Sequence, residues 1–217
     1  MIGANGTLGA ALVAQLKKTH RVHELSQDNS DYSESSLRDI GLKLKEDGQL
    51  EKIVCCIGTL HNDLLYPEKR LNQLNQESLS EYFRINTILP TLCIKAFAPL
   101  LDKSIDTQFG ILSAMVGSIS DNKLGGWYGY RSSKAALNMM VKTASIELAR
   151  SHKRLALCAI HPGTTQGNLS KPFASRVDKS KYYTPQQSAT RIIRVLNGLK
   201  PNDTGQFLNW DGKVIPW

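Results

Sequence analysis

A tyrosine and a lysine four residues apart could share one acid–base task. Tyr130 and Lys134 stand at the start of a segment whose apolar spacing predicts a helix, so both side chains would project from one face. An ammonium group beside a phenol favours the phenolate and lowers the tyrosine pKa from ~10. We therefore predict that Tyr130 serves as a general acid or base. A surface Tyr–Lys pair without chemistry is the alternative, because this spacing also arises by chance.

A glycine-rich loop near the amino terminus could bind phosphate groups. The loop opens directly into a second predicted helix, and the amide groups and positive end of a helix suit an anion such as a pyrophosphate. Three glycines at this spacing could also form only a tight turn. The candidate cofactor contacts in this loop are Gly3, Asn5, Gly6, Thr7, Leu8 and Gly9.

The elements that would position these groups alternate in kind along the chain. Short β-branched runs predict strands, and longer stretches with helical spacing predict helices between them. The predicted strands are 21–25, 52–57, 108–113, 155–160 and 205–209, the predicted helices are 8–18, 78–101, 132–150 and 185–199, and the predicted loops are 26–35, 58–77, 114–129 and 161–184. This alternation predicts an α/β fold of the Rossmann type, a doubly wound parallel sheet with helices on both faces. No linker divides the sequence, so residues 1–217 are expected to form a single dinucleotide-binding domain.

The composition fits a soluble globular chain rather than a membrane protein. Of the 217 residues, 41% are hydrophobic and 21% are charged, a balance typical of globular domains. No apolar stretch reaches the ~18 to 20 residues of a bilayer span, and the amino terminus lacks the pattern of a signal peptide. The four cysteines form no CxxC pair, so we expect reduced thiols and a cytoplasmic protein.

The formal net charge of +8 raises the question of a nucleic-acid partner. The basic residues are scattered, without a dense run and without interleaved aromatic side chains for base stacking. We therefore expect a solvated basic face and no nucleic-acid binding. His20 and His23 lack Asp, Glu or Cys partners at metal spacing, so no metal site is predicted.

Several ordered motifs resemble the short-chain dehydrogenase/reductase family, and within it the branch of C-factor proteins and sniffer-type carbonyl reductases. The resemblance covers essentially the whole chain. Its specific segments are 3–9, 58–61, 84–86, 116–122, 125–138, 161–165, 210–212 and 215–217. It implies NADP or NAD as cofactor, and hydride transfer between the nicotinamide and a small-molecule carbonyl or alcohol substrate.

The resemblance also implies roles for single residues. Tyr130 would protonate a carbonyl oxygen as hydride arrives, and Lys134 would hold the nicotinamide ribose hydroxyls while tuning Tyr130. Asn86 would interrupt its helix locally and hold a water that passes protons to Lys134. Further cofactor contacts are implied at Gly58, Pro162, Gly163 and Thr165.

The position of the family's substrate-orienting serine, three residues before Gly117, is occupied by Ala114. Ser113 is the nearest hydroxyl group, and we predict it as the catalytic serine, with Ser118 as the alternative. A hydroxyl donor matters at this place because it would stabilise oxygen charge in the transition state.

The choice between NAD and NADP is weakly encoded. An acidic side chain after the predicted strand 21–25 would suit a free ribose 2′-hydroxyl, and an arginine would suit a 2′-phosphate. No arginine occurs within 26–31, and by resemblance Asp31 is the predicted contact. Lys17 and Lys18 could still attract a phosphate, so both cofactors stay open.

The first strand is apparently truncated. A strand of ~5 to 6 residues should precede the glycine loop, but only Met1 and Ile2 do. That strand would be central, so its absence would leave its neighbours with unpaired NH and CO groups. Either the native polypeptide continues before Met1 or the cofactor site is impaired; we favour the first interpretation.

Together these features predict an NAD(P)-dependent short-chain dehydrogenase or carbonyl reductase. The alternative is a C-factor-like nucleotide-binding signalling protein with little turnover, suggested by Ala114 and Thr7. An epimerase or dehydratase would also use a tyrosine and a lysine at this spacing, but too few residues follow Lys134 for the extra substrate domain. The resemblance further implies a homodimer or homotetramer formed through the two long helices.

Overall fold

The central element is a parallel sheet with the strand order β1-β2-β3-β6. The computed structural model describes residues 1–176 and 178–217. The strands of this sheet are β1 (Lys52–Cys55), β2 (Thr107–Leu112), β3 (Leu155–His161) and β6 (Phe207–Asn209). Neighbouring strands run parallel throughout, and β2 and β3 are buried along most of their length. Such continuous burial is typical of parallel strands covered on both faces.

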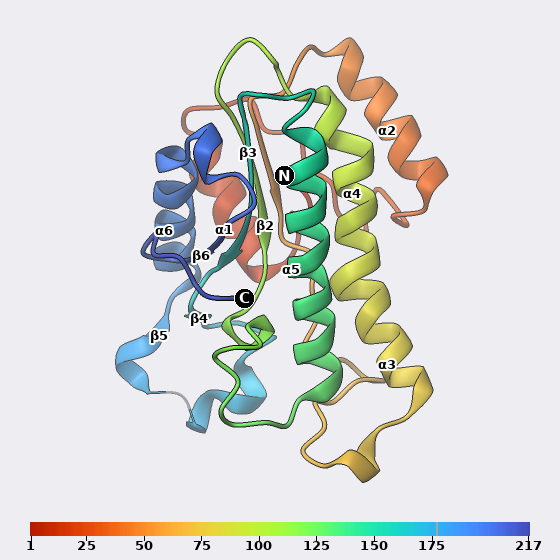
Figure 1. The fold of residues 1–217 in the computed structure, drawn as a ribbon, viewed down its shortest axis with the longest axis vertical. Coiled ribbons are helices and arrows are strands. Elements are labelled where there is room, and N and C mark those ends of the chain that lie inside the picture. The colour runs from red at the N-terminus through yellow and green to blue at the C-terminus, as the bar shows by residue number, and fades with distance from the viewer. Residues whose placement is uncertain (177) are drawn as a thin grey trace.

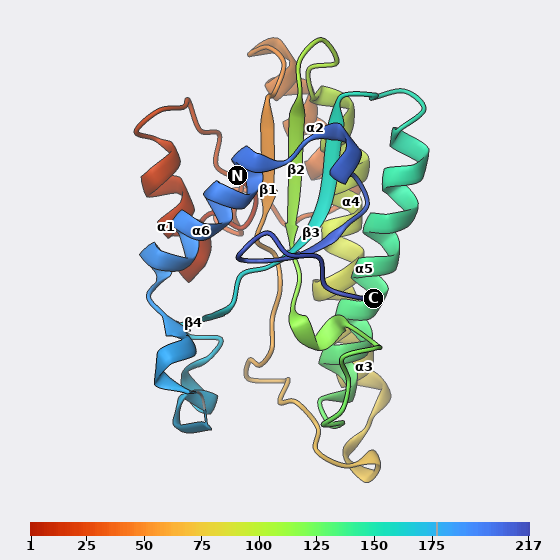
Figure 2. The same ribbon diagram turned by 60° about the vertical axis from the view of Figure 1, so that its left-hand side comes forward.

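Helices cover both faces of this sheet (Figure 1). They include α1 (Thr7–Leu16), α2 (Glu34–Glu46), α4 (Leu89–Phe97), α5 (Tyr128–Leu148) and α6 (Pro185–Gly198). Helices α1 and α6 pack on one face around Leu12 and Ile192. Helices α2, α4 and α5 cover the other face around Leu37, Phe97 and Leu137. Figure 2 shows the sheet between the two helical layers, so the predicted doubly wound α/β fold is confirmed.

The helix predicted over 78–101 is present but locally interrupted. It consists of α3 (Gln76–Phe83), a π-helical turn (Arg84–Ile88) and α4. Asn86 lies in the π-helical turn and is fully buried. The interruption implied for this residue is therefore present, and π-helical turns of this kind often occur at functional sites.

Helix α2 was not predicted, and its first residues lie in the segment expected to be a loop, 26–35. Its start is a serine cap, because the side chain of Ser33 accepts a hydrogen bond from the amide of Ser36. Only Leu37 and Gly41 of this helix are buried, so its apolar stripe is too narrow to stand out in the sequence.

The predicted strand 21–25 is wrong for most of its length. Only Leu25 takes part in a β-bridge, and its partner is Ile2. Ile2 also bridges to Cys55 on its other side. Among the described residues, Ile2 therefore forms β-bridges both to segment 21–25 and to β1. Met1 adds two hydrogen bonds on the side of segment 21–25, to the carbonyl of His23 and from the amide of Leu25.

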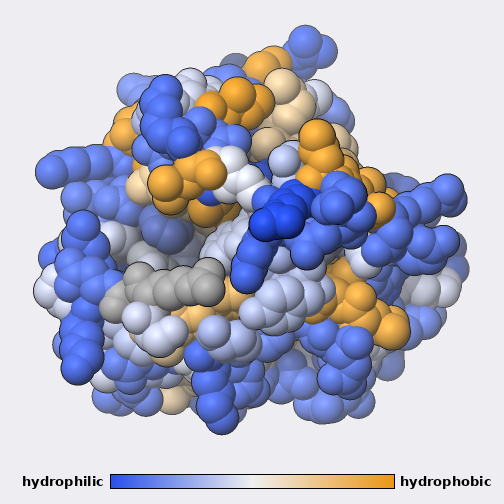
Figure 3. All heavy atoms as spheres, turned by 90° about the horizontal axis from the view of Figure 1, so that it is seen from below, coloured by the Kyte–Doolittle hydropathy of each residue, from blue (hydrophilic) through white to orange (hydrophobic). Residues whose placement is uncertain are grey.

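The loops that follow the strands gather at the carboxyl end of the sheet. The segment after β3 contains the short parallel pair β4 (Thr164–Thr165) and β5 (Tyr182–Tyr183), which was predicted as loop. Figure 3 views the molecule from this end, where apolar side chains lie among hydrophilic ones. Within the described residues no helix is long and apolar enough to cross a membrane.

Candidate active site

Three predicted residues converge where β1 and β2 end. A β-carbon placed on Gly58 would lie 2.9 Å from Nζ of Lys134 and 3.2 Å from Oδ1 of Asn86. A side chain at this position would therefore displace Lys134 and Asn86. The side-chain oxygen of Asn86 accepts a hydrogen bond from the amide of Thr59 at 2.8 Å, and its amide group donates to the carbonyl of Thr59 at 3.0 Å and to Oγ of Ser133 at 3.1 Å. These bonds fix the loop after β1 against α5.

Lys134 points inward from α5 and is 4% exposed. Its Nζ donates to the carbonyl oxygen of Leu112 at 3.2 Å. Burial lowers the pKa of Lys134 to about 8, because the buried ammonium loses its hydration. Two of the three N–H donors of an ammonium group then remain for other acceptors.

Tyr130 lies in the first turn of α5 and is 7% exposed. Its ring packs 6.4 Å from that of Tyr82 and 6.2 Å from that of Trp127, measured between centroids. Burial raises the pKa of the Tyr130 phenol above its ordinary value. The lowering of the pKa predicted from Lys134 is absent, because the loss of hydration of the buried phenolate is the sole cause of the shift.

The hydroxyl groups of both candidate serines make hydrogen bonds within the protein. The hydroxyl group of Ser113 donates to Oδ1 of Asn138 on α5 at 2.6 Å, and Ser118 donates to the carbonyl of Pro216 at 2.5 Å. The residue of this segment that belongs to the apolar cluster with Tyr130 is Ala114. Both candidate hydroxyl groups therefore have a partner within the protein, and Ala114 contributes only a methyl group to the cluster that contains Tyr130.

The glycine loop has the geometry of a phosphate site. Gly3 has a φ of +74°, and a β-carbon on Gly9 would lie 2.0 Å from the carbonyl oxygen of Gly3. Helix α1 begins at Thr7, and no side chain caps its first turn. Free amide groups at a helix start and a loop that excludes side chains suit the pyrophosphate of a dinucleotide. Across the loop, a β-carbon on Gly167 would lie 3.0 Å from Oγ1 of Thr7, so the segment after β4 reaches the glycine loop.

The acidic residue that reaches the glycine loop is Asp28, not the predicted Asp31. Asn5 donates to Oδ2 of Asp28 at 3.2 Å, and Ser26 donates to the same oxygen at 3.1 Å. Asp31, the predicted contact, instead accepts from the amide of Ser33 at the start of α2, which lowers the pKa of its carboxyl group. Both residues lie in the same short segment, and only the fold shows which one turns towards the loop.

The Pro162-Gly163 turn ends β3 as predicted, with a φ of +78° at Gly163. Thr165 lies in β4, and its hydroxyl group shares a hydrogen bond of 2.8 Å with Oγ of Ser188. Beside this turn, the guanidinium of Arg191 lies 3.6 Å from the ring centroid of Tyr183 and 4.1 Å from that of Trp210.

A buried carboxylate near Tyr130 was also not predicted from the sequence. Glu68 is 5% exposed, and its Oε2 accepts from the amide of Gly129 in the first turn of α5 at 3.1 Å. Its backbone carbonyl also accepts from the amide of Trp127. A negative charge at the start of a helix is favourable, so Glu68 helps to hold the turn that carries Tyr130. Its place in a predicted loop gave no signal of this contact.

These features are typical of a dinucleotide-dependent oxidoreductase. They are the doubly wound parallel sheet, the uncapped helix start beside a glycine loop, and the buried tyrosine and lysine on one helix. The family model described as short chain dehydrogenase matches residues 1–178. The chain belongs to the short-chain dehydrogenase family, and it is an NAD(P)-dependent oxidoreductase.

Curated relatives and solved structures agree with this assignment. The chain is 31% identical over 186 residues to 1-hydroxy-2-glutathionyl-2-methyl-3-butene dehydrogenase of Rhodococcus sp., with 85% of this chain and 76% of that protein covered. It is 30% identical over 148 residues to C-signal of Myxococcus xanthus, with 68% and 83% covered. The carbonyl reductase Sniffer of D. melanogaster shares the fold with a TM-score of 0.81 and 22% identity, and NADPH-bound carbonyl reductase from chicken fatty liver does so with 0.80 and 23%; in both cases 100% of this chain and 97% of the other are covered.

Proposed function

We propose that this oxidoreductase reduces a small apolar carbonyl compound, with Tyr130 as the proton donor. The observation that carries the proposal is the buried position of Tyr130 on the same helix as Lys134, beside the cradle formed by Gly58 and Asn86. The dinucleotide, when bound, supplies the hydride. The residues described above bind and orient it, exclude water and supply the proton.

The glycine loop and the start of α1 would bind the pyrophosphate through their amide groups. The Nζ of Lys134 has donors to spare beyond the carbonyl of Leu112, and it would hold the ribose hydroxyls. Asn86 would keep the loop after β1 in place, since its three hydrogen bonds tie that loop to α5. Pro162, Gly163 and Thr165 would lie against the nicotinamide.

The protonation of Tyr130 sets the pH dependence of each direction of the reaction. Its raised pKa keeps the phenol neutral near pH 7, and a neutral phenol can donate a proton to an oxygen that gains negative charge. Alcohol oxidation needs the phenolate, so it should be slow at neutral pH and accelerate as the pH rises. We therefore propose carbonyl reduction as the reaction to assay at neutral pH.

The substrate class follows from the side chains around Tyr130. The apolar cluster here contains Leu60, Leu65 and Ala114, with Trp127 and Phe173 packed against it. Apolar walls with few polar groups are typical of small-molecule sites. We infer an apolar carbonyl compound whose oxygen is bound by Tyr130.

We propose NAD in preference to NADP. The carboxylate of Asp28 is tied to the glycine loop through Asn5, where it could accept a hydrogen bond from a ribose 2′-hydroxyl and would repel a 2′-phosphate. Calorimetry with NADH and NADPH measures this preference. Tighter binding of NADPH would contradict it.

The decisive test of the function is Tyr130→Phe, assayed with bound cofactor against a panel of apolar aldehydes and ketones. We expect the wild type to oxidise NADH or NADPH with at least one of them, and the variant to lose at least about 10²-fold in kcat, a typical loss for a missing general acid. Ser132→Ala is the matched control, because Ser132 lies on the same helix but bonds the carbonyl of Tyr128 instead. Undiminished turnover in Tyr130→Phe would refute the proposed role.

A second candidate is a dinucleotide-binding signalling protein with little turnover. The observation that favours it is Ala114, because the position of the family's serine carries no hydroxyl group and Ser113 donates its own to Asn138. Dinucleotide binding in calorimetry without turnover of any carbonyl in the panel would support this candidate.

We also infer a homodimer or homotetramer of single-domain subunits in the cytoplasm. Exposed apolar side chains lie on the outer face of the long helices, with Ile88, Met139 and Ile146 exposed by 50%, 65% and 55%. A second copy could cover them. Sedimentation analysis tests this, with Ile146→Glu as the variant expected to dissociate. The cytoplasmic location is consistent with the free thiols of all four cysteines.

A further inference from the structure

The turn that precedes α5 has an uncommon backbone conformation. Trp127, the residue before the first turn of this helix, has a φ of +53° and a ψ of +43°. Gly125 and Gly126 before it both have a φ of +65°, which glycine adopts freely. Tryptophan does not, because its β-carbon crowds the backbone in the left-handed region. A bulky residue in this conformation persists only where its neighbours hold it, and such positions cluster at functional sites.

Glu68 holds this turn through two separate contacts. Its backbone carbonyl accepts a hydrogen bond from the amide of Trp127. Its carboxylate oxygen Oε2 accepts another from the amide of Gly129 at 3.1 Å. The side chain of Trp127 makes no capping bond to α5, so Glu68 supplies from a distant segment the acceptor that a capping residue normally supplies. The two contacts lie on either side of Tyr128 and fix the direction in which α5 begins.

The contact between Glu68 and α5 is closely packed. A β-carbon on Gly129 would lie 2.9 Å from Oε1 of Glu68 and 2.4 Å from Cδ2 of Tyr82. The glycine therefore allows both side chains to lie directly against the first turn of α5. Tyr82 is fully buried, and its ring centroid lies 6.4 Å from that of Tyr130. Because Gly129 directly precedes Tyr130 in the chain, a change in this contact also moves the phenol.

Stabilisation of the fold does not account for this carboxylate. Glu68 is buried, and its second oxygen, Oε1, has no hydrogen-bond partner among the described residues. A buried carboxylate with an unpaired oxygen loses its hydration without full compensation. An apolar side chain of similar size would avoid this cost. A polar group kept under such conditions calls for another explanation, and a role in the reaction is one.

The loop that carries Glu68 is also attached to other groups of the site. Near its start, Thr59 exchanges two hydrogen bonds with Asn86. The next residue, Leu60, accepts a hydrogen bond from the hydroxyl group of Tyr82 at 2.7 Å. Glu68 adds an attachment further along the loop, to the first turn of α5. The place of Tyr130 relative to Asn86 therefore depends on this loop.

We propose that Glu68 is a positioning residue for the reaction, which holds the left-handed turn at Trp127 and thereby sets the place of Tyr130. The same turn puts the ring centroid of Trp127 6.2 Å from that of Tyr130 and 5.1 Å from that of Phe173, so it also places part of the substrate wall. The proposal rests on the proposed role of Tyr130 as proton donor. Loss of the carboxylate should slow carbonyl reduction and leave dinucleotide binding unchanged, because both contacts of Glu68 are with the start of α5 and not with the glycine loop.

The test compares Glu68→Ala with Glu68→Gln, using the best substrate of the panel of apolar aldehydes and ketones. Glutamine keeps an acceptor for the amide of Gly129, so its kcat should stay within about threefold of that of the wild type. Alanine removes the acceptor, and we expect kcat to fall by about 10- to 100-fold, the range for a misplaced catalytic group. The Kd of the dinucleotide should not change in calorimetry. The matched control is Glu77→Ala, which removes an exposed carboxylate from the first turn of α3 and should change neither quantity.

A second background tests the route through the turn. In Trp127→Gly the left-handed conformation is no longer unfavourable, so the turn needs less support from Glu68. The additional loss of kcat caused by Glu68→Ala should therefore shrink to about threefold or less in this background. Equal losses in both backgrounds would show that Glu68 does not act through the turn.

Amide hydrogen exchange separates failure of this proposal from failure of the proposed function. The amides of Trp127 and Gly129 should exchange at least about tenfold faster in Glu68→Ala than in the wild type, whether or not any carbonyl is reduced. Unchanged exchange, an unchanged kcat in Glu68→Ala, or equal losses of kcat and dinucleotide affinity would each overturn the proposal. If Glu68→Ala does not fold, Glu68→Asp replaces it with the same expectations, because its shorter side chain draws the carboxylate away from Gly129. Retained turnover in Tyr130→Phe would instead refute the proton-donor role.

Discussion

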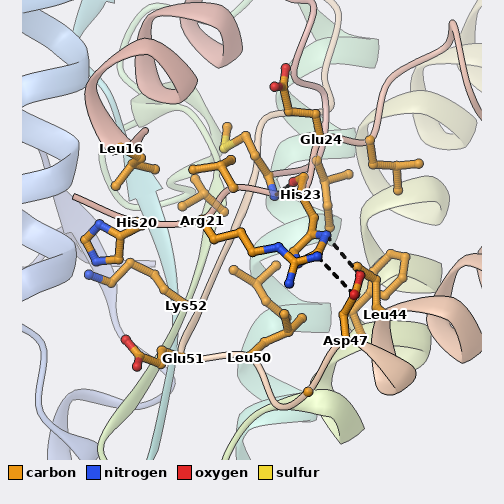
Figure 4. A pocket seen from close by; sticks show the side chains of 18 of the residues that line it. Leu16, His20, Arg21, His23, Glu24, Leu44, Asp47, Leu50, Glu51 and Lys52 are labelled. Atoms are coloured by element: carbon orange, nitrogen blue, oxygen red, sulfur yellow. Dashed lines mark hydrogen bonds and ion pairs between the residues drawn. The ribbon is translucent and has the colours of Figure 1, made fainter. Parts of the chain in front are cut away.

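The two ends of the parallel sheet differ in how their polar groups are satisfied. At the carboxyl end, Asn86 makes three hydrogen bonds to the loop after β1 and to α5, and Lys134 bonds the end of β2. At the amino end, an amine is buried beside a cavity of about 550 Å³ (Figure 4). The same strands thus run from an end that contains a cavity to an end where the polar side chains are hydrogen-bonded. This difference indicates that the catalytic groups lie where the fold holds their side chains in place.

The largest effect should come from filling the glycine loop. In Gly9→Ala the added β-carbon would lie 2.0 Å from the carbonyl oxygen of Gly3, a backbone atom that cannot swing away. We expect a loss of about 3 kcal/mol or more in the free energy of unfolding, and dinucleotide binding too weak to measure by calorimetry.

Gly198→Ala is the control for this substitution, because nothing lies within 4 Å of its β-carbon position. This glycine ends α6, at the other end of the sheet from the glycine loop. Its replacement should leave dinucleotide binding unchanged. Normal dinucleotide affinity in Gly9→Ala would show that the loop is not the phosphate site.

Two leucines on α1 allow the packed core to be compared with the cavity at the amino end of the sheet. Leu12 is fully buried between α1 and the sheet, whereas Leu16, one turn further on, lines the cavity. Leu12→Ala should cost about 3 to 5 kcal/mol in chemical denaturation, near the upper range for leucine truncation. Leu16→Ala should cost about 1 to 2 kcal/mol, because one side of Leu16 already lacks packing partners. Equal costs for the two leucines would mean that the cavity does not weaken packing at the amino end.

The dependence of stability on pH should report the buried ammonium of Lys134. Its pKa is about 8 in the folded chain and ~10.4 when unfolded, so the unfolded state binds more protons between these values. The free energy of unfolding should therefore rise with pH across this window, by about 3 kcal/mol in total. Below pH 8 the ammonium is present in both states and the cost of burying it is complete.

Urea unfolding of the wild type and of Lys134→Met between pH 7.5 and 10 isolates this contribution. The wild type should gain stability relative to the variant as the pH rises, because methionine keeps the aliphatic stem and carries no charge. A constant difference between the two proteins across this range would contradict a lowered pKa for Lys134.

The sequence predicted the fold well where the chemistry is local. The periodicity of the sequence predicted α1 and α6 to within two residues at each end. Gly58 matches the family pattern at a position where a β-carbon would lie close to Nζ of Lys134. The choice of Asp31 over Asp28 could not be decided from spacing, because their carboxylates turn to different neighbours within one short loop. The direction of the Tyr130 pKa also depended on burial, which spacing does not report.

The smallest predicted effect concerns the missing hydroxyl beside Tyr130. Ala114 is buried in the cluster that contains Tyr130, and Ser113 is held by Asn138. Ala114→Ser would add a donor at this place, and removal of such donors elsewhere costs about 2.7 to 4 kcal/mol in the transition state. Because the surrounding cluster is apolar and has not been shaped around a serine, we expect only part of this gain, about tenfold in kcat.

Ser113→Ala is the contrasting variant: it should lower stability by about 1 kcal/mol through the lost bond to Asn138 and leave kcat near that of the wild type. A large loss of kcat in Ser113→Ala, with no gain in Ala114→Ser, would restore Ser113 as the catalytic hydroxyl and would show that the carboxyl end of the sheet rearranges when substrate binds.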